Sequence, residues 1–312
     1  MSIMEEIIWI IFFTMINMEI EKALKNNRIF RAITWITPEE FKRLLPIFTQ
    51  ILIETAIKKK NRQRAYWWWR KWNIKEPSKK LFFILVYLKV YPTYDFLAYM
   101  FNSSRTRVFN RVKDFLPILE KTLWRTLSLP ARQITTPEEF YKLFPWVKEI
   151  MIDWVERPMI RKKKAKNQTK NYSWKKKWPR RKNTVIADKN KKILYLSPTK
   201  NWKLHDKKQI DKTVVLPTIP KEIEVFVDSW FQWIQHIHNN THIPKKNTKK
   251  NPLTDEDKEN NHLISSIRIV VENAICWMKR FKVSSDIFRW KKWQDDKFNL
   301  IAAWLWNFHL QS

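Results

Sequence analysis

Three acidic residues occur in sequence contexts that could support metal-ion chemistry. Asp153 and Asp228 each follow a short apolar segment typical of a buried strand, and Glu272 lies in an apolar stretch of a predicted helix. Because strand ends place polar side chains at a cleft, we expect the three carboxylates to meet there. Carboxylate oxygens suit Mg²⁺, and two such ions about 4 Å apart can promote cleavage of a phosphodiester. The pattern predicts that Asp153, Asp228 and Glu272 are catalytic metal ligands, binding two Mg²⁺ (or Mn²⁺) ions.

Positively charged residues accompany these acids. Arg268 and Lys279 share the predicted helix with Glu272, and the three stay within about 40° of one helix face. Residues 161–182 contain twelve lysines or arginines and no acid. We expect Arg268, Lys279 and the run's Lys175, Lys176 and Lys177 to hold phosphates that the acids alone would repel. The alternatives are an ordinary helical ion pair between Arg268 and Glu272, and a solvated cationic tail.

The histidines are less informative. His205 and Asp206 could position a water or contact the substrate beside the acids, or they could simply mark the start of a helix. Three further histidines, His236, His238 and His242, lie in a segment rich in asparagine. Their spacing does not match a helical histidine pair, so we predict loop residues and not zinc ligands.

The overall charge indicates the partner. The chain carries 61 lysines and arginines against 30 acids, a formal net charge of +31. Such an excess points to a polyanion, and no basic amphipathic helix favours a membrane surface, so we expect double-stranded DNA and no membrane. Cys276 is the single cysteine, which excludes disulfides within the chain and fits a cytoplasmic, nucleoid-associated protein. The apolar run at residues 7–16 is too short to span a bilayer.

The amino-terminal part is predicted to be helical. Thr37 and Pro38 begin a helix that extends to Ile57, and residues 58–80 form a basic linker. Three helices follow at residues 80–90, 93–101 and 104–119, with a tight turn between the last two. This layout is typical of a helix-turn-helix, although an ordinary three-helix bundle has the same pattern. The predicted DNA contacts are Arg105, Thr106, Arg107, Asn110 and Arg111.

The pattern changes after residue 148. A strand at residues 150–152, a hairpin formed by residues 184–187 and 193–196, and a strand at residues 224–227 precede a helix capped by Thr254 that runs to about residue 281. We therefore predict an α+β protein whose helical DNA-binding part is followed by a mixed-sheet catalytic part. The expected divisions are an amino-terminal helical extension (1–34), a helix-turn-helix domain (35–130) and a catalytic domain (131–312).

Glycine and tryptophan usage is anomalous. The chain has no glycine and 19 tryptophans, whereas average usage gives about 22 glycines in this length. Several tryptophans, including Trp154 and Trp230, follow an aspartate or lie where a turn favours glycine. Our hypothesis is that UGA encodes glycine in the source and is shown here as tryptophan. The alternative is a genuine tryptophan-rich protein that stacks single-stranded bases on its indoles. Literal indoles at these two positions would crowd the metal site.

Several segments carry a family resemblance. The carboxy-terminal two thirds resembles the catalytic domain of bacterial insertion-sequence transposases with a DDE triad, in the DDE superfamily endonuclease group. The matching segments are residues 152–158, 172–177, 194–198, 205–206, 227–233 and 264–279. Ser265, Arg268, Glu272 and Lys279 have the spacing of the family's Tyr-Arg-Glu-Lys signature, with serine replacing tyrosine. The amino-terminal half resembles the helix-turn-helix domain that precedes this core.

The resemblance implies a ribonuclease-H-like fold for the catalytic domain, with Asp153, Asp228 and Glu272 as its metal ligands. It also implies glycine at Trp154, Trp174, Trp230 and Trp233. The implied activity is metal-dependent cleavage of DNA at transposon ends and strand transfer to target DNA, with a homo-oligomer formed during synapsis of the two terminal repeats. The alternative is a catalytically inactive or domesticated DNA-binding protein derived from a transposase. The chain departs from the family at Val155 and at residues 179–181, which bears on DNA contacts more than on the triad.

Overall fold

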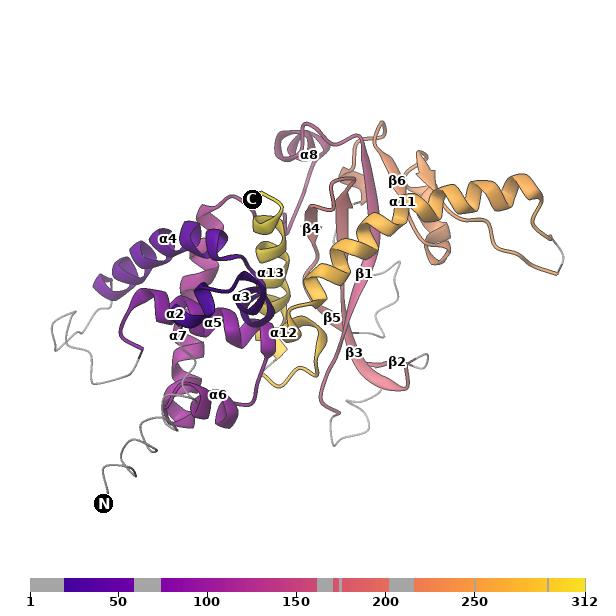
Figure 1. Ribbon diagram of the computed structural model, residues 1–312. Helices are drawn as coiled ribbons and strands as arrows, with labels where there is room; N and C mark the ends of the chain where they lie inside the picture. Colours follow the sequence, from indigo (N-terminus) through magenta and orange to yellow (C-terminus); the bar gives the residue numbers. More distant parts are fainter. Residues whose placement is uncertain are drawn as a thin grey trace, which may run out of the picture. The chain divides into compact units, whose positions relative to one another are not determined.

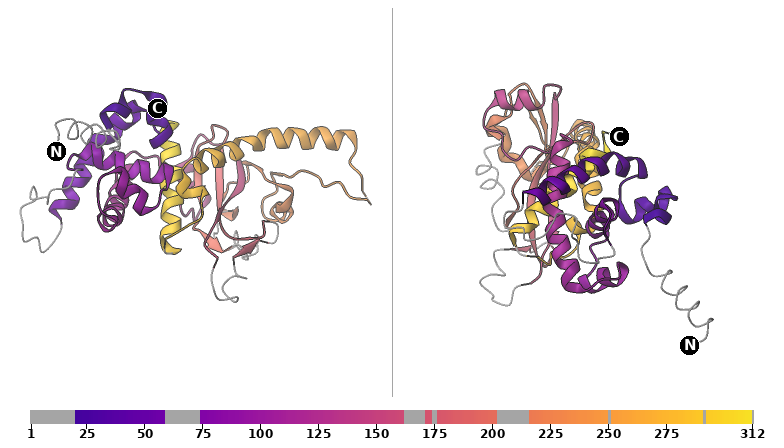
Figure 2. Two further views of the ribbon diagram at one scale, coloured as in Figure 1. Left: turned by 60° about the horizontal axis from the view of Figure 1, so that its bottom comes forward. Right: turned by 90° about the vertical axis from the view of Figure 1, so that its left-hand side faces the viewer.

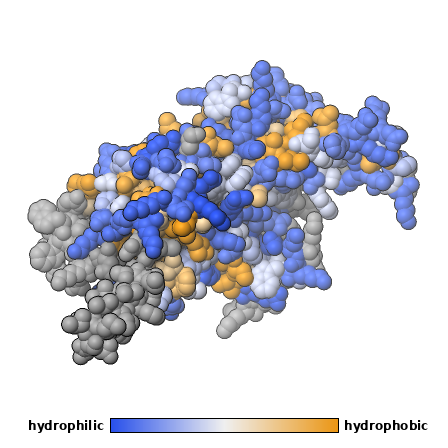
Figure 3. Space-filling view, viewed as in Figure 1, coloured by the Kyte–Doolittle hydropathy of each residue, from blue (hydrophilic) through white to orange (hydrophobic). Residues whose placement is uncertain are grey.

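The computed structural model describes residues 20–58, 74–161, 171–173, 176–201, 216–249, 251–290 and 292–311 (Figure 1). These residues form two compact units. The first contains the described residues up to Leu127 together with Phe281–Val283, and the second contains Ser128–Arg280 and Ser284–Gln311. Among the helices described, none combines the length and the apolar character that crossing a membrane requires. The face seen in Figure 3 is mostly hydrophilic, with scattered apolar patches.

The first unit is a helical bundle built around one buried helix. Its helices are α2 (Ile20–Leu24), α3 (Asn27–Thr34), α4 (Pro38–Ile57), α5 (Pro77–Val90), α6 (Tyr94–Met100) and α7 (Arg105–Arg125). Helix α5 is buried continuously from Lys80 to Leu88, and α3, α4 and α7 pack around it. Within this core Phe83 meets Phe101 edge to face at a centroid distance of 4.9 Å. The bundle is therefore held by apolar contacts on every side of α5.

Local capping explains where these helices begin. Thr37 accepts a hydrogen bond from the Glu40 amide (3.1 Å), and the Glu40 carboxylate accepts one from the Thr37 amide (2.7 Å). This capping box confirms the predicted start of α4. Thr93 caps α6 with a single hydrogen bond, which its hydroxyl accepts from the amide of Phe96. The predicted turn after α6 is also present, and Asn102 there adopts a positive φ of 44°.

Two predicted boundaries in this unit are wrong. Helix α7 does not end at residue 119 but continues to Arg125. Pro117 removes one backbone hydrogen bond, but its side chain is exposed, and burial of Leu119 and Leu123 carries the helix onward. The predicted linker at residues 58–80 is also too long, because Ile74 is buried and α5 begins at Pro77. Residues 59–73 of that linker lie outside the described residues.

The second unit contains a seven-stranded mixed sheet. Its strands are β1 (Glu149–Pro158), β2 (Tyr172–Ser173), β3 (Trp178–Asp188), β4 (Ile193–Leu196), β5 (Lys200–Asn201), β6 (Glu224–Phe226) and β7 (Thr241–His242). The order is β2-β3-β1-β6-β7, with β4 and β5 also paired to β3. The β1–β3 and β3–β4 pairs are antiparallel, whereas β1–β6 and β6–β7 are parallel. This topology confirms the predicted α+β, ribonuclease-H-like class.

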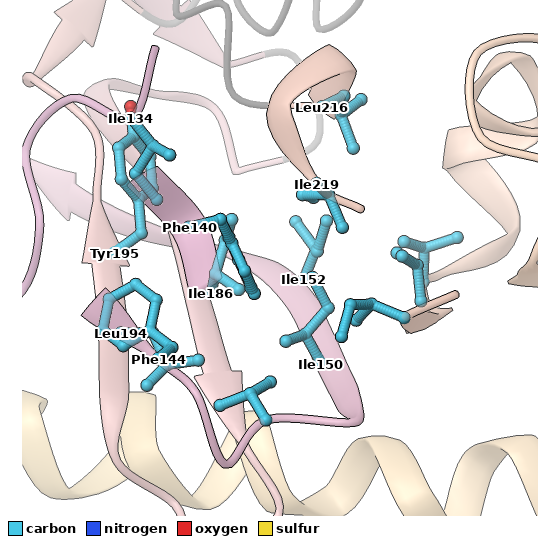
Figure 4. Close-up of a cluster of buried hydrophobic side chains, with 14 of the residues drawn as sticks. Ile134, Phe140, Phe144, Ile150, Ile152, Ile186, Leu194, Tyr195, Leu216 and Ile219 are labelled. Carbon is cyan, nitrogen blue, oxygen red and sulfur yellow. The ribbon is translucent and has the colours of Figure 1, made fainter. Parts of the chain in front are cut away.

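The helical segments after residue 127 are α8 (Pro137–Leu143), η1 (Leu216–Thr218), η2 (Ser229–His236), α11 (Asp255–Lys279), α12 (Lys282–Ser285) and α13 (Lys292–His309). The first two residues of α12 belong to the first unit. The side chains of Ile150 and Ile152 on β1 join Phe140, Phe144 and Leu216 in one buried apolar cluster (Figure 4). Helix α11 packs on β1 and β3, and also against α13. Successive side chains of β1 therefore alternate between the apolar cluster and the α11 side.

Helix α11 extends beyond the sheet. Its amino-terminal part projects past the strands, and the preceding segment runs outward beside it (Figure 2). Lys245 fastens this segment to the helix, because its Nζ lies 2.8 Å from Asp257 Oδ2 and its backbone exchanges two hydrogen bonds with the side chain of Asn261. Thr254 and Asp257 form the predicted capping box.

Strand β1 is longer than predicted. It does not end at Asp153, which pairs with Val185 in mid-strand, but continues to Pro158. The continuation carries Arg157, which is buried and lies 2.7 Å from Asp295 Oδ1. A buried arginine needs such a partner, and α13 supplies it from far along the chain.

Part of the predicted cationic run belongs to the sheet. Residues 162–170, 174 and 175 lie outside the described residues, but residues 178–182 belong to β3. Arg181 is buried and its Nη1 lies 3.0 Å from Asp295 Oδ2, and Lys182 is buried with its Nζ 4.3 Å from the centre of the Trp154 ring. These cations are therefore part of the folded sheet, and the alternative of a solvated cationic tail does not hold for them.

Candidate active site

Asp153 and Asp228 are brought together by the parallel pairing of β1 and β6. Met151 pairs with Phe226, each two residues before an aspartate, and the charge of Asp228 acts on Asp153. Neighbouring strands lie about 4.8 Å apart. Asp228 follows the end of β6 and caps η2, so two elements distant in sequence present carboxylates at one place.

Each aspartate is anchored by the backbone that follows it. Asp153 Oδ1 accepts a hydrogen bond of 2.7 Å from the amide of Trp154, and Asp228 Oδ1 accepts one of 2.6 Å from the amide of Ser229. A carboxylate held by its own chain has a restricted orientation. The other oxygen of each group remains for a different partner.

Helix α11 contributes the third carboxylate and an arginine. Arg268 Nη2 lies 3.5 Å from Glu272 Oε1, one turn along the helix, and Arg268 Nη1 lies 3.8 Å from Asp228 Oδ1. The side chain of Arg268 is buried, with 8% of the residue exposed, whereas Glu272 is exposed to solvent. The contact with Asp228 means that the ion pair between Arg268 and Glu272 is not merely a local feature of one helix.

The electrostatics link all three acids. The pKa of Asp153 is raised from its ordinary value to about 6, chiefly by burial and also by the charges of Glu272 and Asp228, while the Trp154 amide and Arg268 act in the opposite direction. Mutual effects of this kind require carboxylates that are close in a region of low dielectric. Perturbed acids of this kind are typical of functional sites.

The arrangement does not form a finished metal cage. Among the described residues, no group of three or more histidine, cysteine or acidic side chains is spaced to hold a metal ion. The donor set nevertheless fits a hard divalent cation, because it consists of carboxylate oxygens that repel one another. The guanidinium of Arg268 lies between two of these carboxylates.

Lys279 lies on the same side of α11. Burial lowers its pKa, and the negative charges of Glu156 and Asp153 partly restore it. Glu156 in turn lies 3.7 Å from Arg180 on β3. Sequence reasoning missed Glu156 and Arg180 as neighbours of the site, because the β1–β3 register that brings them together is not visible in the sequence.

The indole of Trp154 does not crowd the acids. Asp153 and Trp154 are consecutive in a strand, so their side chains point to opposite faces. Trp154 packs at the apolar cluster, where its ring meets Phe231 edge to face at 4.8 Å. The Trp230 side chain is 70% exposed. The prediction that literal indoles would obstruct the site is therefore wrong for Trp154.

The remaining predicted site residues are placed as follows. Lys176 and Lys177 are exposed in the turn before β3. Lys175, His205 and Asp206 lie outside the described residues. Of the three histidines predicted to be loop residues, His236 ends η2 and His242 lies in β7, so the loop prediction is wrong for these two.

In the first unit, α6 and α7 form the two helices of the predicted DNA-reading motif. Val108 and Val112 of α7 are buried, and the opposite face carries the predicted contacts. Arg105, Thr106, Arg107 and Asn110 are exposed, whereas Arg111 is half-buried with its Nη1 3.4 Å from Asp114 Oδ2. The amino-terminal turn of α7 therefore presents a basic surface.

Comparison with known proteins agrees with this fold and site. The DDE superfamily endonuclease family matches residues 152–307, and the helix-turn-helix of DDE superfamily endonuclease matches residues 74–123. The chain therefore belongs to the DDE superfamily endonucleases. It is also 25% identical over 295 residues to the probable transposase for insertion sequence element IS702 from Microchaete diplosiphon, covering 94% of this chain and 99% of that protein. These matches confirm the resemblance to insertion-sequence DDE transposases. No solved structure matches the chain significantly.

Proposed function

We propose that the chain cleaves DNA at the ends of an insertion sequence and joins the freed 3′-hydroxyl to target DNA. The observation that carries this proposal is the convergence of Asp153, Asp228 and Glu272 from β1, the end of β6 and α11. Membership of the DDE superfamily endonucleases and the transposase relative support the same chemistry.

The three carboxylates would hold divalent ions, Mg²⁺ or Mn²⁺. Bound there, two ions would lower the pKa of the attacking water and stabilise the leaving oxygen. The chain's own residues orient the reaction: the anchored carboxylates of Asp153 and Asp228 fix the donor positions, and Arg268 and Lys279 bind phosphates of the scissile strand. Lys175, Lys176 and Lys177 would add charge that holds the DNA, and His205 and Asp206 would position a water or contact the substrate.

Recognition of the transposon end belongs to the helical part of the chain, residues 35–130. Arg105, Thr106, Arg107, Asn110 and Arg111 would read or clamp the terminal repeat from α7. Residues 131–312 would form the catalytic domain, and residues 1–34 an extension. Synapsis of two ends requires at least two active sites, so we propose a homo-oligomer acting on the DNA of the cytoplasmic nucleoid.

A cleavage assay tests the proposal. Labelled duplexes containing the ends of the element are incubated with the full-length protein and Mg²⁺. The expected result is cleavage that Asp153→Asn abolishes while binding of the duplex persists. Glu272→Gln should behave in the same way, and Glu259→Gln, an exposed acid on the same helix, serves as the matched control. Binding without cleavage by the unaltered protein would instead identify an inactive DNA-binding derivative.

A further inference from the structure

Arg268 forms ion pairs with the carboxylates that a metal ion would need as ligands. Its two Nη atoms lie 3.8 Å from Asp228 and 3.5 Å from Glu272, and its charge also acts on Asp153. One guanidinium is thus the common cationic partner of all three acids. A divalent ion bound by two of these carboxylates would need their oxygens at about 2.1 Å. The guanidinium of Arg268 already lies between the carboxylates of Asp228 and Glu272.

The contacts of Arg268 are loose for a side chain so deeply buried. Hydrogen bonds between a guanidinium and a carboxylate are commonly about 2.7–2.9 Å long, and both of its ion pairs are longer. Its Nε is buried and has no hydrogen-bond partner among the described residues. Arg157 offers a contrast, because it lies 2.7 Å from Asp295 in a close ion pair. Arg268 therefore offsets part of the acids' negative charge without being held to them by close hydrogen bonds.

We propose that Arg268 is a built-in counter-ion of the three acids, which divalent metal ions displace when they bind. This inference rests on the proposed function, since it assumes that the same acids hold the ions. Two cations cannot share the space between Asp228 and Glu272 without strong repulsion, so entry of the metal ions drives the guanidinium out. Arg268 is accordingly a positioning residue that keeps the acids together before the metal arrives.

Displacement gives the arginine a second partner. A guanidinium has five donors in a planar fork that matches the oxygens of a phosphate. Once released from the acids, Arg268 can turn to a DNA phosphate beside the metal ions. Metal and DNA then assist each other's binding, because each favours the displaced position of the same side chain.

Metal binding without DNA provides the first test. Mn²⁺ is titrated calorimetrically into full-length protein carrying Arg268→Gln, and its affinity is compared with that of the unaltered protein. The variant should bind Mn²⁺ on the order of tenfold more tightly, because nothing has to be displaced. Arg268→Lys keeps the charge and should stay closer to the unaltered protein. Lys258→Gln removes one charge from the exposed end of the same helix and should change nothing.

If Arg268→Gln binds Mn²⁺ no more tightly than the unaltered protein, the proposed displacement of Arg268 is refuted, while the proposed function is left intact. If neither protein binds Mn²⁺, the metal site of the proposed function fails together with this inference.

A measurement on the unaltered protein covers the case in which Arg268→Gln does not fold. Arginines are labelled with a dicarbonyl reagent with and without Mn²⁺ and located by mass spectrometry. Labelling of Arg268 should rise with Mn²⁺ while that of buried Arg157 stays low, and an unchanged Arg268 would refute the displacement.

Discussion

Asp228 lies close enough to Asp153 for its charge to raise the pKa of that carboxyl, because β1 and β6 are parallel neighbours that pair Met151 with Phe226, each two residues before an aspartate. The two residues are far apart in sequence, and each is tied to the backbone amide that follows it. The positions of these two carboxylates therefore depend on the sheet, and only the third, on α11, depends on how a helix packs over it. Substitutions at the aspartates should consequently change the chemistry without disturbing the fold.

Asp153→Asn should abolish DNA cleavage and spare DNA binding. Asparagine keeps the size of the side chain and can still accept the hydrogen bond from the Trp154 amide, but it removes one anionic ligand. We expect the cleavage rate to fall on the order of 10³-fold or more, since metal-ion stabilisation of the transition state is worth several kcal/mol. Single-turnover cleavage and gel-shift measurements on the same duplex check both parts. A variant that cleaves at a rate near that of the unaltered protein would remove Asp153 from the catalytic residues.

The same substitution should stabilise the metal-free protein at neutral and alkaline pH. Burial raises the pKa of Asp153 to about 6 from 3.8, so the ionised carboxylate disfavours the folded state. This penalty is absent below about pH 4, grows between pH 4 and pH 6, and is complete above pH 6, where it corresponds to about 3 kcal/mol. Urea unfolding in the presence of a chelator should show Asp153→Asn to be more stable than the unaltered protein at pH 8. The advantage should shrink towards pH 4. If the difference in free energy of unfolding between the two proteins is the same from pH 4 to pH 8, the pKa of Asp153 is not raised in the folded state.

Asp295 should be far more important for folding than for cleavage. It lies between two buried arginines, with Oδ1 2.7 Å from Arg157 and Oδ2 3.0 Å from Arg181. Asp295→Asn leaves both guanidinium charges uncompensated in the interior, which costs about 3–5 kcal/mol. The control is Asp255→Asn, which breaks a surface ion pair with Lys258 and should cost less than about 1 kcal/mol. Equal losses in urea unfolding would show that the buried cluster contributes no more than a surface pair.

The sequence predicted what depends on local interactions. The starts of α4 and α11 follow from capping boxes in which the partners are three residues apart, Thr37 with Glu40 and Thr254 with Asp257. The acids were predicted to meet because each belongs to a recognisable apolar segment. The length of β1 was not predictable. Its continuation contains the buried Arg157, whose charge is compensated by Asp295 on the last helix, α13.

The same limit applies within the candidate site. The sequence shows Arg268 and Glu272 at the spacing of an ordinary helical ion pair. It does not show that Arg268 also reaches Asp228, because that contact depends on how α11 packs on the sheet. The role proposed for Arg268 as a displaceable counter-ion could therefore be inferred only from the structure.

Arg107→Ala should weaken binding of the terminal repeat. Arg107 is exposed on the first turns of α7, whereas its neighbour Val108 is buried. Loss of an arginine that contacts a base or phosphate costs about 1–3 kcal/mol, which is roughly a 5-fold to 150-fold loss of affinity. Lys121→Ala, an exposed cation at the far end of the same helix, controls for net charge. Fluorescence anisotropy with specific and scrambled duplexes measures both, and equal effects of the two substitutions would contradict a reading role for α7.

Residue 35 should be glycine in the protein as it is made in its source. The residue at this position ends α3 with φ of 80°, the left-handed conformation that glycine adopts without penalty at the end of a helix. An L-residue with a side chain pays about 1–2 kcal/mol there, although the buried indole of Trp35 gains packing against Phe281. If UGA is read as glycine, the tryptic peptide of residues 32–42 from the native host will be lighter by the difference between tryptophan and glycine. The coding DNA will carry UGA at positions 35, 154, 174 and 230. UGG codons there, or the heavier peptide, would establish tryptophan and leave the strained cap to be offset by packing alone.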